Sequence, residues 1–313
     1  MAAAFPHSLG LVGVGTIGSA VVQGLCSGKD GAVVESVVLS PRGAARAEAL
    51  RAQFPKTVRV AGSNEEVVEE AGCVVVAVLP KQAEEVLRGL QFRPDQQVIS
   101  LVAGLPFERL RDLCAPGSVS IAIPFPSVAK RRGAALLLHP GPAATAIFER
   151  LGRCVAVEDE EQFRRLTCVS GLMGNFYSEQ LTAQEWLQGQ GVPAKAAAAW
   201  TSAAFGAFAA DCADAGPSTF RELIAEQTPG GLNEKVWQLM EEDGNHQALR
   251  YALDAVNHRL GHGSFDPART PAKRRMAAQG LDVSSGSPSA LFAALLAVWQ
   301  SWRRARRRRA SKL

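Results

Sequence analysis

The sequence lacks a hydrophobic run long enough to cross a membrane. A spanning helix needs roughly 18 or more apolar residues in a row, and the longest apolar stretch, residues 290–299, ends at Gln300 and a series of arginines. Residues 1–8 carry no positive charge ahead of their apolar residues, so we expect no secretory signal. These absences disfavour an integral membrane protein and a secreted one.

Paired cysteines and clustered metal ligands are also missing. The six cysteines stand singly, without a C-x-x-C pair, so we expect reduced and mostly buried thiols of an intracellular protein. None of the five histidines has a second ligand at metal spacing. We therefore expect no disulfide framework and no metal site.

The net charge of +4 in 313 residues is unevenly distributed. Residues 261–313 contain eleven Lys or Arg and two Asp or Glu, which leaves a charge of −5 on residues 1–260. The total suggests a basic, nucleic-acid-binding protein. The distribution indicates instead a mildly acidic body with a basic tail, and we expect no nucleic-acid partner.

Short apolar runs alternate with helical patterns through the first half of the chain. This alternation indicates βαβ units, and near-continuous apolar strands are typical of a parallel sheet covered on both faces. We expect an α/β domain over residues 1–157, with further strands near residues 134–138 and 155–157. The main predicted strands are residues 9–12, 33–39, 57–61, 73–79, 97–102 and 118–123.

Strand patterns stop after residue 157 and only helical patterns follow. The predicted helices are residues 160–190, 193–215, 218–226, 232–242 and 246–260. Residues 194–213 are so rich in Ala, Phe and Trp that we expect burial nearly all round. This favours an all-α substrate and dimerisation domain over residues 158–261, although a central helix in a monomeric bundle is the alternative. A linker and tail follow over residues 262–313.

The first predicted strand leads into the glycine-rich loop Gly13-Val14-Gly15-Thr16-Ile17-Gly18, and a helical pattern follows it. In this setting G-x-G-x-x-G binds the pyrophosphate of a dinucleotide. The glycines allow a tight turn and close approach of the phosphates, and the helix N-terminus offers free N–H groups. The sequence therefore predicts a Rossmann-type parallel-sheet domain that binds a dinucleotide.

The end of the second predicted strand distinguishes NAD from NADP. An NAD site usually has Asp or Glu about 20 residues after the glycines, whereas here the chain has Ser40-Pro41-Arg42 and no acidic residue. A hydroxyl and a guanidinium suit a 2′-phosphate, because arginine pairs with phosphate through two hydrogen bonds. We expect NADP, used as NADPH. The alternative is that Arg42 is only a solvated residue at a helix start.

Five motifs follow one another in a fixed order. They are residues 9–20, Asn64-Glu-Glu-Val-Val, Ala77-Val-Leu-Pro80, residues 98–104, and Thr228-Pro-Gly-Gly231 before a helix. In order and spacing, residues 8–260 resemble the pyrroline-5-carboxylate reductases, the last enzymes of proline synthesis. The resemblance implies an NADPH-dependent reduction of a C=N bond. It also implies that Asn64 contacts the adenosine ribose, that the helix after residue 231 binds substrate, and that the helical domain forms an interlocked dimer.

Departures from that family fall on the substrate side. Two threonines follow Pro-Gly-Gly in the family, the second bonding the imine, whereas this chain has Leu232 and Asn233. Residues 170–175 and 124–127 differ as well. The alternatives are therefore another cyclic imine, a keto acid, or a non-catalytic NADP-binding dimer. A β-hydroxyacid dehydrogenase is disfavoured because residues 170–190 contain no lysine.

The predicted site residues fall into three groups. Asn233 and Thr228 are the predicted catalytic residues, with Asn233 bonding the imine or amine nitrogen; the alternative is that Asn233 is only a helix-start residue. Leu232 and the backbone N–H groups of Gly230 and Gly231 are expected to bind substrate, the N–H groups holding a carboxylate. The predicted cofactor residues are Gly13, Gly15, Thr16, Ile17, Gly18, Ser40, Arg42, Asn64, Val78, Leu79, Pro80 and Ala103.

The tail ends in Ser311-Lys312-Leu313, preceded by the arginines of residues 303–309. This tripeptide matches the peroxisomal address, which an import receptor reads and which does not anchor a protein. We expect a peroxisome or related microbody, and otherwise the cytoplasm. The alternatives are a nuclear or nucleic-acid-binding arginine patch and an amphipathic membrane anchor over residues 291–302.

Overall fold

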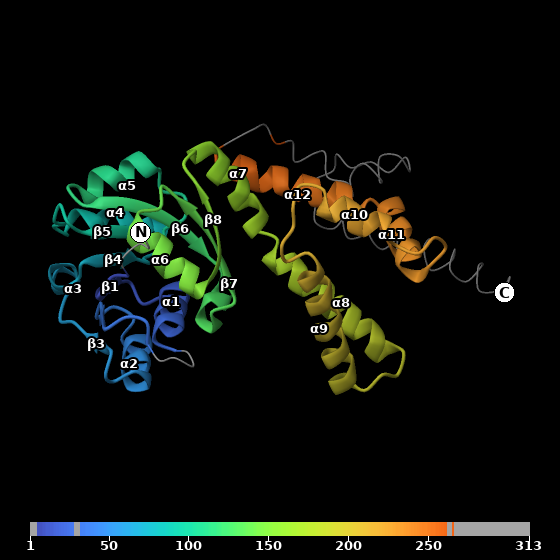
Figure 1. Cartoon of the computed structure of the whole chain (residues 1–313), viewed down its shortest axis with the longest axis horizontal. Helices are drawn as coiled ribbons and strands as arrows, with labels where there is room; N and C mark the ends of the chain where they lie inside the picture. Colours follow the sequence, from blue (N-terminus) through green and yellow to red (C-terminus); the bar gives the residue numbers. More distant parts are fainter. Residues whose placement is uncertain (1–4, 28–31, 262–264, 266–313) are drawn as a thin grey trace, which may run out of the picture. The chain divides into compact units, whose positions relative to one another are not determined.

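The computed structural model describes residues 5–27, 32–261 and 265, and it divides into two compact units (Figure 1). The first unit is Met1–Ser170 and the second begins at Gly171. The peroxisomal tripeptide, the arginine run and nearly all of the predicted linker lie outside the described residues, so the predicted address stays a prediction. Within the described part, no helix combines the length and the hydrophobicity needed to span a membrane.

The first unit is built on one eight-stranded sheet with the order β3-β2-β1-β4-β5-β6-β7-β8. Every neighbouring pair is parallel except β6 and β7, which are antiparallel. The predicted α/β parallel-sheet architecture is thereby confirmed. The strands are β1 (Ser8–Val12), β2 (Ser36–Leu39), β3 (Val58–Val60), β4 (Cys73–Val76), β5 (Gln97–Ser100), β6 (Ser118–Pro124), β7 (Gly133–Leu138) and β8 (Gly152–Val157).

Successive strand residues point to opposite sides of the sheet, so these apolar strands have apolar side chains on both faces. Helices cover both faces. Leu9 and Leu11 of β1 pack into a core with α1 (Thr16–Cys26), α2 (Ala44–Gln53) and α6 (Pro142–Leu151). Val12 packs on the other side. There the core includes residues of α3 (Asn64–Glu70), α4 (Pro80–Arg88), α5 (Phe107–Cys114) and α7 (Glu160–Ser170).

The sequence patterns placed most of these elements, missed two and gave the wrong bounds for two others. They did not indicate α6 or the short 3₁₀ helix η1 (Pro126–Lys130). The predicted strand over residues 73–79 ends at Val76, and residues 77–79 form the loop before α4. The single helix predicted over residues 160–190 is two helices, α7 and α8 (Met173–Gly189), separated at Gly171 and Leu172.

The boundary between the units also lies later than residue 157. Helix α7 contacts β7 and β8, and its Phe163 is buried in the core beneath α3, α4 and α5. The loss of strand patterns at residue 157 therefore marks the end of the sheet but not the end of the unit, which extends to Ser170.

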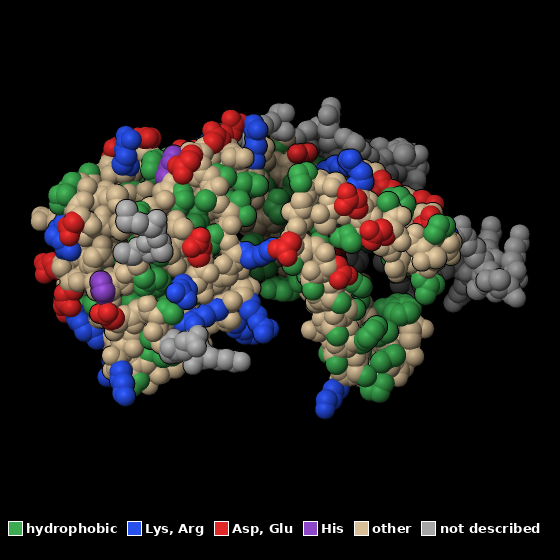
Figure 2. Space-filling model, viewed as in Figure 1, with side chains coloured by type: hydrophobic (Ala, Val, Ile, Leu, Met, Phe, Trp, Pro, Cys, Tyr) green, Lys and Arg blue, Asp and Glu red, His purple; other side chains and the backbone are tan. Residues whose placement is uncertain are grey.

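The described residues of the second unit form helices and no strand. They are α8, α9 (Ala194–Asp211), α10 (Thr219–Ala225), α11 (Leu232–Glu242) and α12 (Asn245–Arg259). Helix α9 packs along α8 and buries Ala197 and Thr201, but Trp200 and Phe208 remain 69% and 63% exposed. The expected burial of residues 194–213 nearly all round is therefore not reached within one chain. Figure 2 shows hydrophobic side chains gathered over α8 and α9.

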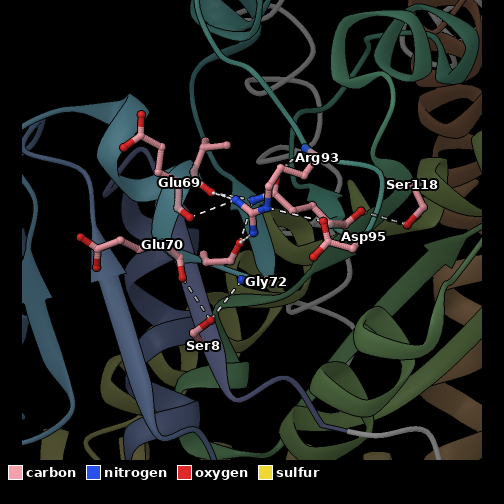
Figure 3. A network of polar contacts seen from close by, with 10 residues as sticks. Ser8, Glu69, Glu70, Gly72, Arg93, Asp95 and Ser118 are labelled. Carbon is pink, nitrogen blue, oxygen red and sulfur yellow. Dashed lines mark hydrogen bonds and ion pairs between the residues drawn. The ribbon is translucent and has the colours of Figure 1, made fainter.

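Two polar side chains close the C-terminal end of α3. The Arg93 guanidinium donates to the carbonyl oxygens of Val68, Glu69 and Ala71 (Figure 3). The buried Gln96 amide donates to the Val68 and Ala71 carbonyls at 2.6 and 2.7 Å. A helix end leaves its last carbonyls without intrahelical donors, so these contacts tie the C-terminal end of α3 to the segment that leads into β5.

Helix α1 and η1 approach so closely that only a glycine fits between them. A Cβ built on Gly24 would lie 2.2 Å from the Val128 carbonyl oxygen and 2.6 Å from Leu151 Cδ2. The Arg131 guanidinium donates to the Gly24 carbonyl at 2.7 Å and so holds η1 in this position. The helix of the glycine-rich loop is therefore packed against η1 by a close backbone contact.

We expect Gly24→Ala to destabilise the protein by about 1–3 kcal/mol, because the added methyl group must displace the η1 backbone. Urea denaturation followed by circular dichroism measures the change. Gly89→Ala is the matched control. Gly89 has a right-handed helical conformation and its Cβ would meet Val86 O at 3.5 Å, so its substitution should change stability by less than about 0.5 kcal/mol. Equal effects of the two substitutions would contradict the packing argument.

Candidate functional site

The glycine-rich loop joins β1 to α1, as the sequence predicts. Gly13 has φ 95°, which favours glycine, and a Cβ there would lie 2.8 Å from the Ala77 carbonyl oxygen. A Cβ on Gly18 would lie 2.9 Å from the Gly13 carbonyl oxygen. Close contacts with the surrounding backbone therefore require glycine at two of the three positions, Gly13 and Gly18.

Gly15 is different, because nothing in the protein requires it to be glycine. It caps α1 with φ −84° and ψ −174°, which any residue adopts, and its Cβ would meet only Ala77 O at 3.7 Å. Helix α1 has no acidic residue in its first turn and no side-chain cap. The space above Gly15 and the uncompensated helix N-terminus together fit a pyrophosphate that lies against the backbone.

The loop lies where the strand order reverses. From β1 the chain continues outward to β2 and β3, and then returns to β4 on the other side of β1. Ligands of open α/β sheets bind in the crevice at such a point, beyond the carboxyl ends of the strands. All seven predicted cofactor residues outside the loop follow the carboxyl ends of β2, β3, β4 and β5 at this same edge: Ser40, Arg42, Asn64, Val78, Leu79, Pro80 and Ala103.

Ser40 supports the glycine-rich loop from the end of β2. Its side chain is completely buried, and its hydroxyl oxygen accepts a hydrogen bond of 2.9 Å from the Gly13 N–H. The hydroxyl proton remains available for a second hydrogen bond. Contact of Ser40 with a 2′-phosphate stays a prediction.

Arg42 is exposed between β2 and α2, where the adenosine end of a dinucleotide would lie. Arg46 is also exposed, one helical turn further along at the start of α2. The sequence analysis missed Arg46, although its spacing of four residues from Arg42 is a usable signal. The two guanidinium groups provide positive charge beside a helix that has no acidic residue in its first turn.

Asn64 lies in the first turn of α3, where it is half-buried. Its position is fixed by its neighbours: Ser63 Oγ accepts from the Glu66 N–H, and Glu66 accepts from the Gly62 N–H and from Arg59. These hydrogen bonds, that of Gly62 foremost, hold the pKa of Glu66 below its usual range. The Asn64 side chain is thus held at the carboxyl edge of the sheet.

The predicted substrate residues all lie in the second unit, around the start of α11. The Gly230 N–H donates to Glu234 Oε2 at 2.6 Å, and the Gly231 N–H donates to the Thr228 carbonyl at 2.9 Å. Both N–H groups therefore have acceptors within the chain itself, and their predicted role in holding a substrate carboxylate stays a prediction. Leu232 is 86% exposed, and the Asn233 amide donates to Gln227 Oε1 at 2.7 Å.

Other catalytic chemistries find little support among the described residues. No cluster of His, Cys, Asp or Glu there has the arrangement of a metal site. Burial raises the pKa of Cys26, Cys73 and Cys114 to about 12, so these thiols stay protonated at neutral pH. A protonated thiol is a poor nucleophile and a poor metal ligand. The dinucleotide loop is thus the best-supported chemical feature of the first unit.

The fold and the loop define a dinucleotide-binding α/β domain of the oxidoreductase type, followed by an all-helical unit. Residues 8–104 match the family model described as "NADP oxidoreductase coenzyme F420-dependent". A pyrroline-5-carboxylate reductase of Pseudomonas aeruginosa is 27% identical over 173 residues, which are 52% of this chain and 62% of that protein. The chain thus matches less than two thirds of that relative's length.

Solved structures extend the similarity to both units. A pyrroline-5-carboxylate reductase from Coxiella burnetii has a TM-score of 0.69 at 20% identity, covering 82% of this chain and 98% of that one. The pyrroline carboxylate reductase of Plasmodium falciparum with NADP bound has a TM-score of 0.66 at 16% identity, covering 81% and 96%. The resemblance to the pyrroline-5-carboxylate reductases, inferred from the motifs, is confirmed in sequence and in fold.

We expect Ser40→Ala to weaken the binding of NADPH and NADH alike, several-fold each, because the Gly13 N–H loses its acceptor and the loop loosens. Loss of one such hydrogen bond also lowers stability by about 1 kcal/mol. Fluorescence titration of both nucleotides and a denaturation midpoint measure the two effects. If NADPH binding alone weakened while stability stayed unchanged, Ser40 would be a phosphate ligand after all.

Proposed function

We propose that this chain is an NADPH-dependent oxidoreductase that reduces a C=N bond. The observation that carries the proposal is the open space above Gly15, which we call the cradle. It adjoins the N-terminus of α1 where the strand order reverses, and nothing in the protein itself requires a glycine at this position. The similarity in sequence and fold to pyrroline-5-carboxylate reductases supports the reaction class.

The first unit would bind the cofactor with its backbone and with two arginines. The N–H groups at the start of α1 would bind the pyrophosphate, and Arg42, aided by Arg46, would pair with the 2′-phosphate that distinguishes NADP from NAD. Val78 and Ala103 follow the ends of β4 and β5, where they would line the crevice beside the cofactor. A bound nicotinamide supplies the hydride, which is the difficult chemical step.

The chain's own contribution is to hold the substrate and to exclude water. The carbon of a protonated C=N bond accepts the hydride and the π electron pair passes to nitrogen, so an amine forms as the nicotinamide is oxidised. A substrate that is already an iminium needs no strong general acid, which fits the replacement of a hydroxyl residue by Asn233. Asn233 would hydrogen-bond the substrate nitrogen. Thr228 lies at the start of the loop that leads into α11.

We further propose that the apolar faces of the second unit are covered by a second copy of the chain. Aromatic side chains on three of its helices are largely exposed in the single chain: Trp200, Phe208, Phe220 and Trp237. Exposed apolar surface of this extent marks an interface more often than a solvated face. A homodimer through the helical unit accounts for this exposure.

The proposed activity is tested by following NADPH consumption by the full chain with pyrroline-5-carboxylate, a carboxylate-free cyclic imine and a keto acid. We expect oxidation that depends on a cyclic imine. Gly15→Ala is the control: its methyl group meets no close neighbour in the protein but occupies the cradle, so the variant should fold normally and bind NADPH at least about tenfold more weakly. Tight NADPH binding without turnover of any substrate would indicate a non-catalytic nucleotide-binding protein.

The choice of NADP depends on Arg42. We expect Arg42→Ala to weaken NADPH binding by about tenfold or more and to leave NADH binding within about twofold, because only NADPH carries the 2′-phosphate. Arg51→Ala is the control, since Arg51 lies in the last turn of α2 and pairs with Glu48. A parent protein that prefers NADH by tenfold or more would contradict the assignment.

A further inference from the structure

We infer that the free edge of β8 is an interface at which a second copy of the chain adds its own β8 in antiparallel orientation. β8 is the last strand in the order of the sheet, and β7 is the only described strand that pairs with it. The inference concerns the sheet unit alone, so it stands apart from the proposed reaction and from the proposed helical interface.

The two edges of the sheet are built differently. β3 has three residues, and Arg59 at its centre pairs with Glu66 at 2.8 Å and with Glu70. β8 has six residues, and Arg153 is the only charged one among them. Natural sheets usually protect a free edge with a short strand or with charged side chains. The β3 edge has both features, whereas the β8 edge lacks them over residues 154–157.

β8 also presents apolar side chains to solvent. Val155 is 55% exposed, and its neighbour Ala156 is exposed as well. Adjacent strand residues point to opposite faces of a sheet, so apolar surface is uncovered on both faces of this edge. The backbone groups of alternate residues in an edge strand point away from the sheet. An added strand would pair with these groups and cover part of both side chains.

Opposite charges gather at the two ends of β8. Five basic residues meet at its start, where η1 and α6 end and where Ala134 of β7 pairs with Arg153. These residues, which we call the basic corner, are Lys130, Arg131, Arg132, Arg150 and Arg153. Glu149 is the only acidic residue from residue 130 to residue 153. Figure 2 shows Lys and Arg side chains gathered near the start of β7.

Acidic residues follow the last residue of the strand. They are Glu158, Asp159, Glu160 and Glu161, which we call the acidic end. Glu160 and Glu161 pair with arginines one turn further along α7. The Glu158 side chain is 77% exposed and contacts His139 at 2.7 Å. Glu158 and Asp159 thus leave this end of β8 negatively charged.

These charges determine which way a second strand runs. Six residues span about 20 Å, so the basic corner and the acidic end are well separated. A second copy added in parallel would place like charges beside each other at both ends. An antiparallel copy, related by a two-fold axis, places each basic corner beside the acidic end of the other copy, and both contacts are attractive.

The edge is therefore complementary to itself, which makes a second copy the occupant that fits it. Pairing Val155 with the partner's Ala156 puts Arg153 opposite the partner's Glu158. The two-fold axis repeats each of these contacts. In this register the apolar residues meet at the centre of the paired strands and the charged residues meet at their ends.

The interface is tested by Val155→Lys, which places an ammonium group at the centre of the edge, where lysine prevents strand pairing. Sedimentation velocity of the full chain over a range of concentrations measures the association. We expect the parent to form assemblies of at least twice the variant's mass, and the variant to associate at least tenfold more weakly. Val169→Lys is the matched control, because Val169 lies in the last turn of α7 and is 56% exposed. Equal masses for the parent and Val155→Lys would overturn the inference.

The antiparallel orientation is tested by reversing charges. Arg153→Glu and Glu158→Arg should each weaken self-association at least fivefold, because each places like charges in both contacts. A mixture of the two variants should associate as strongly as the parent, since every contact between unlike chains again joins opposite charges. These differences should fade in 1 M salt, where the screening length is about 3 Å. A mixture that associates no better than either variant alone would overturn the antiparallel pairing, and so would undiminished association of either variant by itself.

Discussion

The close contact between the loops after β1 and β4 is the constraint on which the cofactor site depends. Gly13 lies against the Ala77 backbone so tightly that no Cβ fits. This contact brings the carboxyl ends of two central strands together where the strand order reverses, and it directs α1 toward the crevice. Ser40, which follows β2, strengthens the arrangement because its hydroxyl oxygen accepts the Gly13 N–H. The ends of β1, β2 and β4 thus hold the glycine-rich turn in place.

The start of α11 depends on a different kind of interaction. Residues 227–234 are shaped by side chains that hydrogen-bond their own backbone and one another: Glu234 accepts the Gly230 N–H, and Gln227 accepts from the Asn233 amide. This segment is thereby held by its own polar side chains, whereas the glycine-rich loop is held by backbone packing.

Much of the fold could be predicted because its determinants are local. Apolar runs, glycines and helix-start patterns placed β1, β6, α11 and α12 closely. Helix α6 was not predicted, because its apolar positions follow an apolar strand and the sequence offers no clear break apart from Gly141-Pro142. The contact of Ser40 with the Gly13 N–H was not predicted for a physical reason: a hydroxyl serves a phosphate and a backbone N–H equally well, and the sequence does not show which groups lie beside it. Likewise, the Glu234 contact depends on a turn whose geometry the sequence does not specify.

The small number of buried residues in the second unit has a consequence for folding. Its five helices bury no large apolar side chain completely, and within α9 only Ala197 and Thr201 are buried. Such a unit gains most of its hydrophobic stabilisation from whatever covers its surface. If a second copy does so, folding of the helices and association are one equilibrium, and the melting temperature of this unit rises with protein concentration. The sheet domain, which has two full cores of its own, needs no such cover in order to fold.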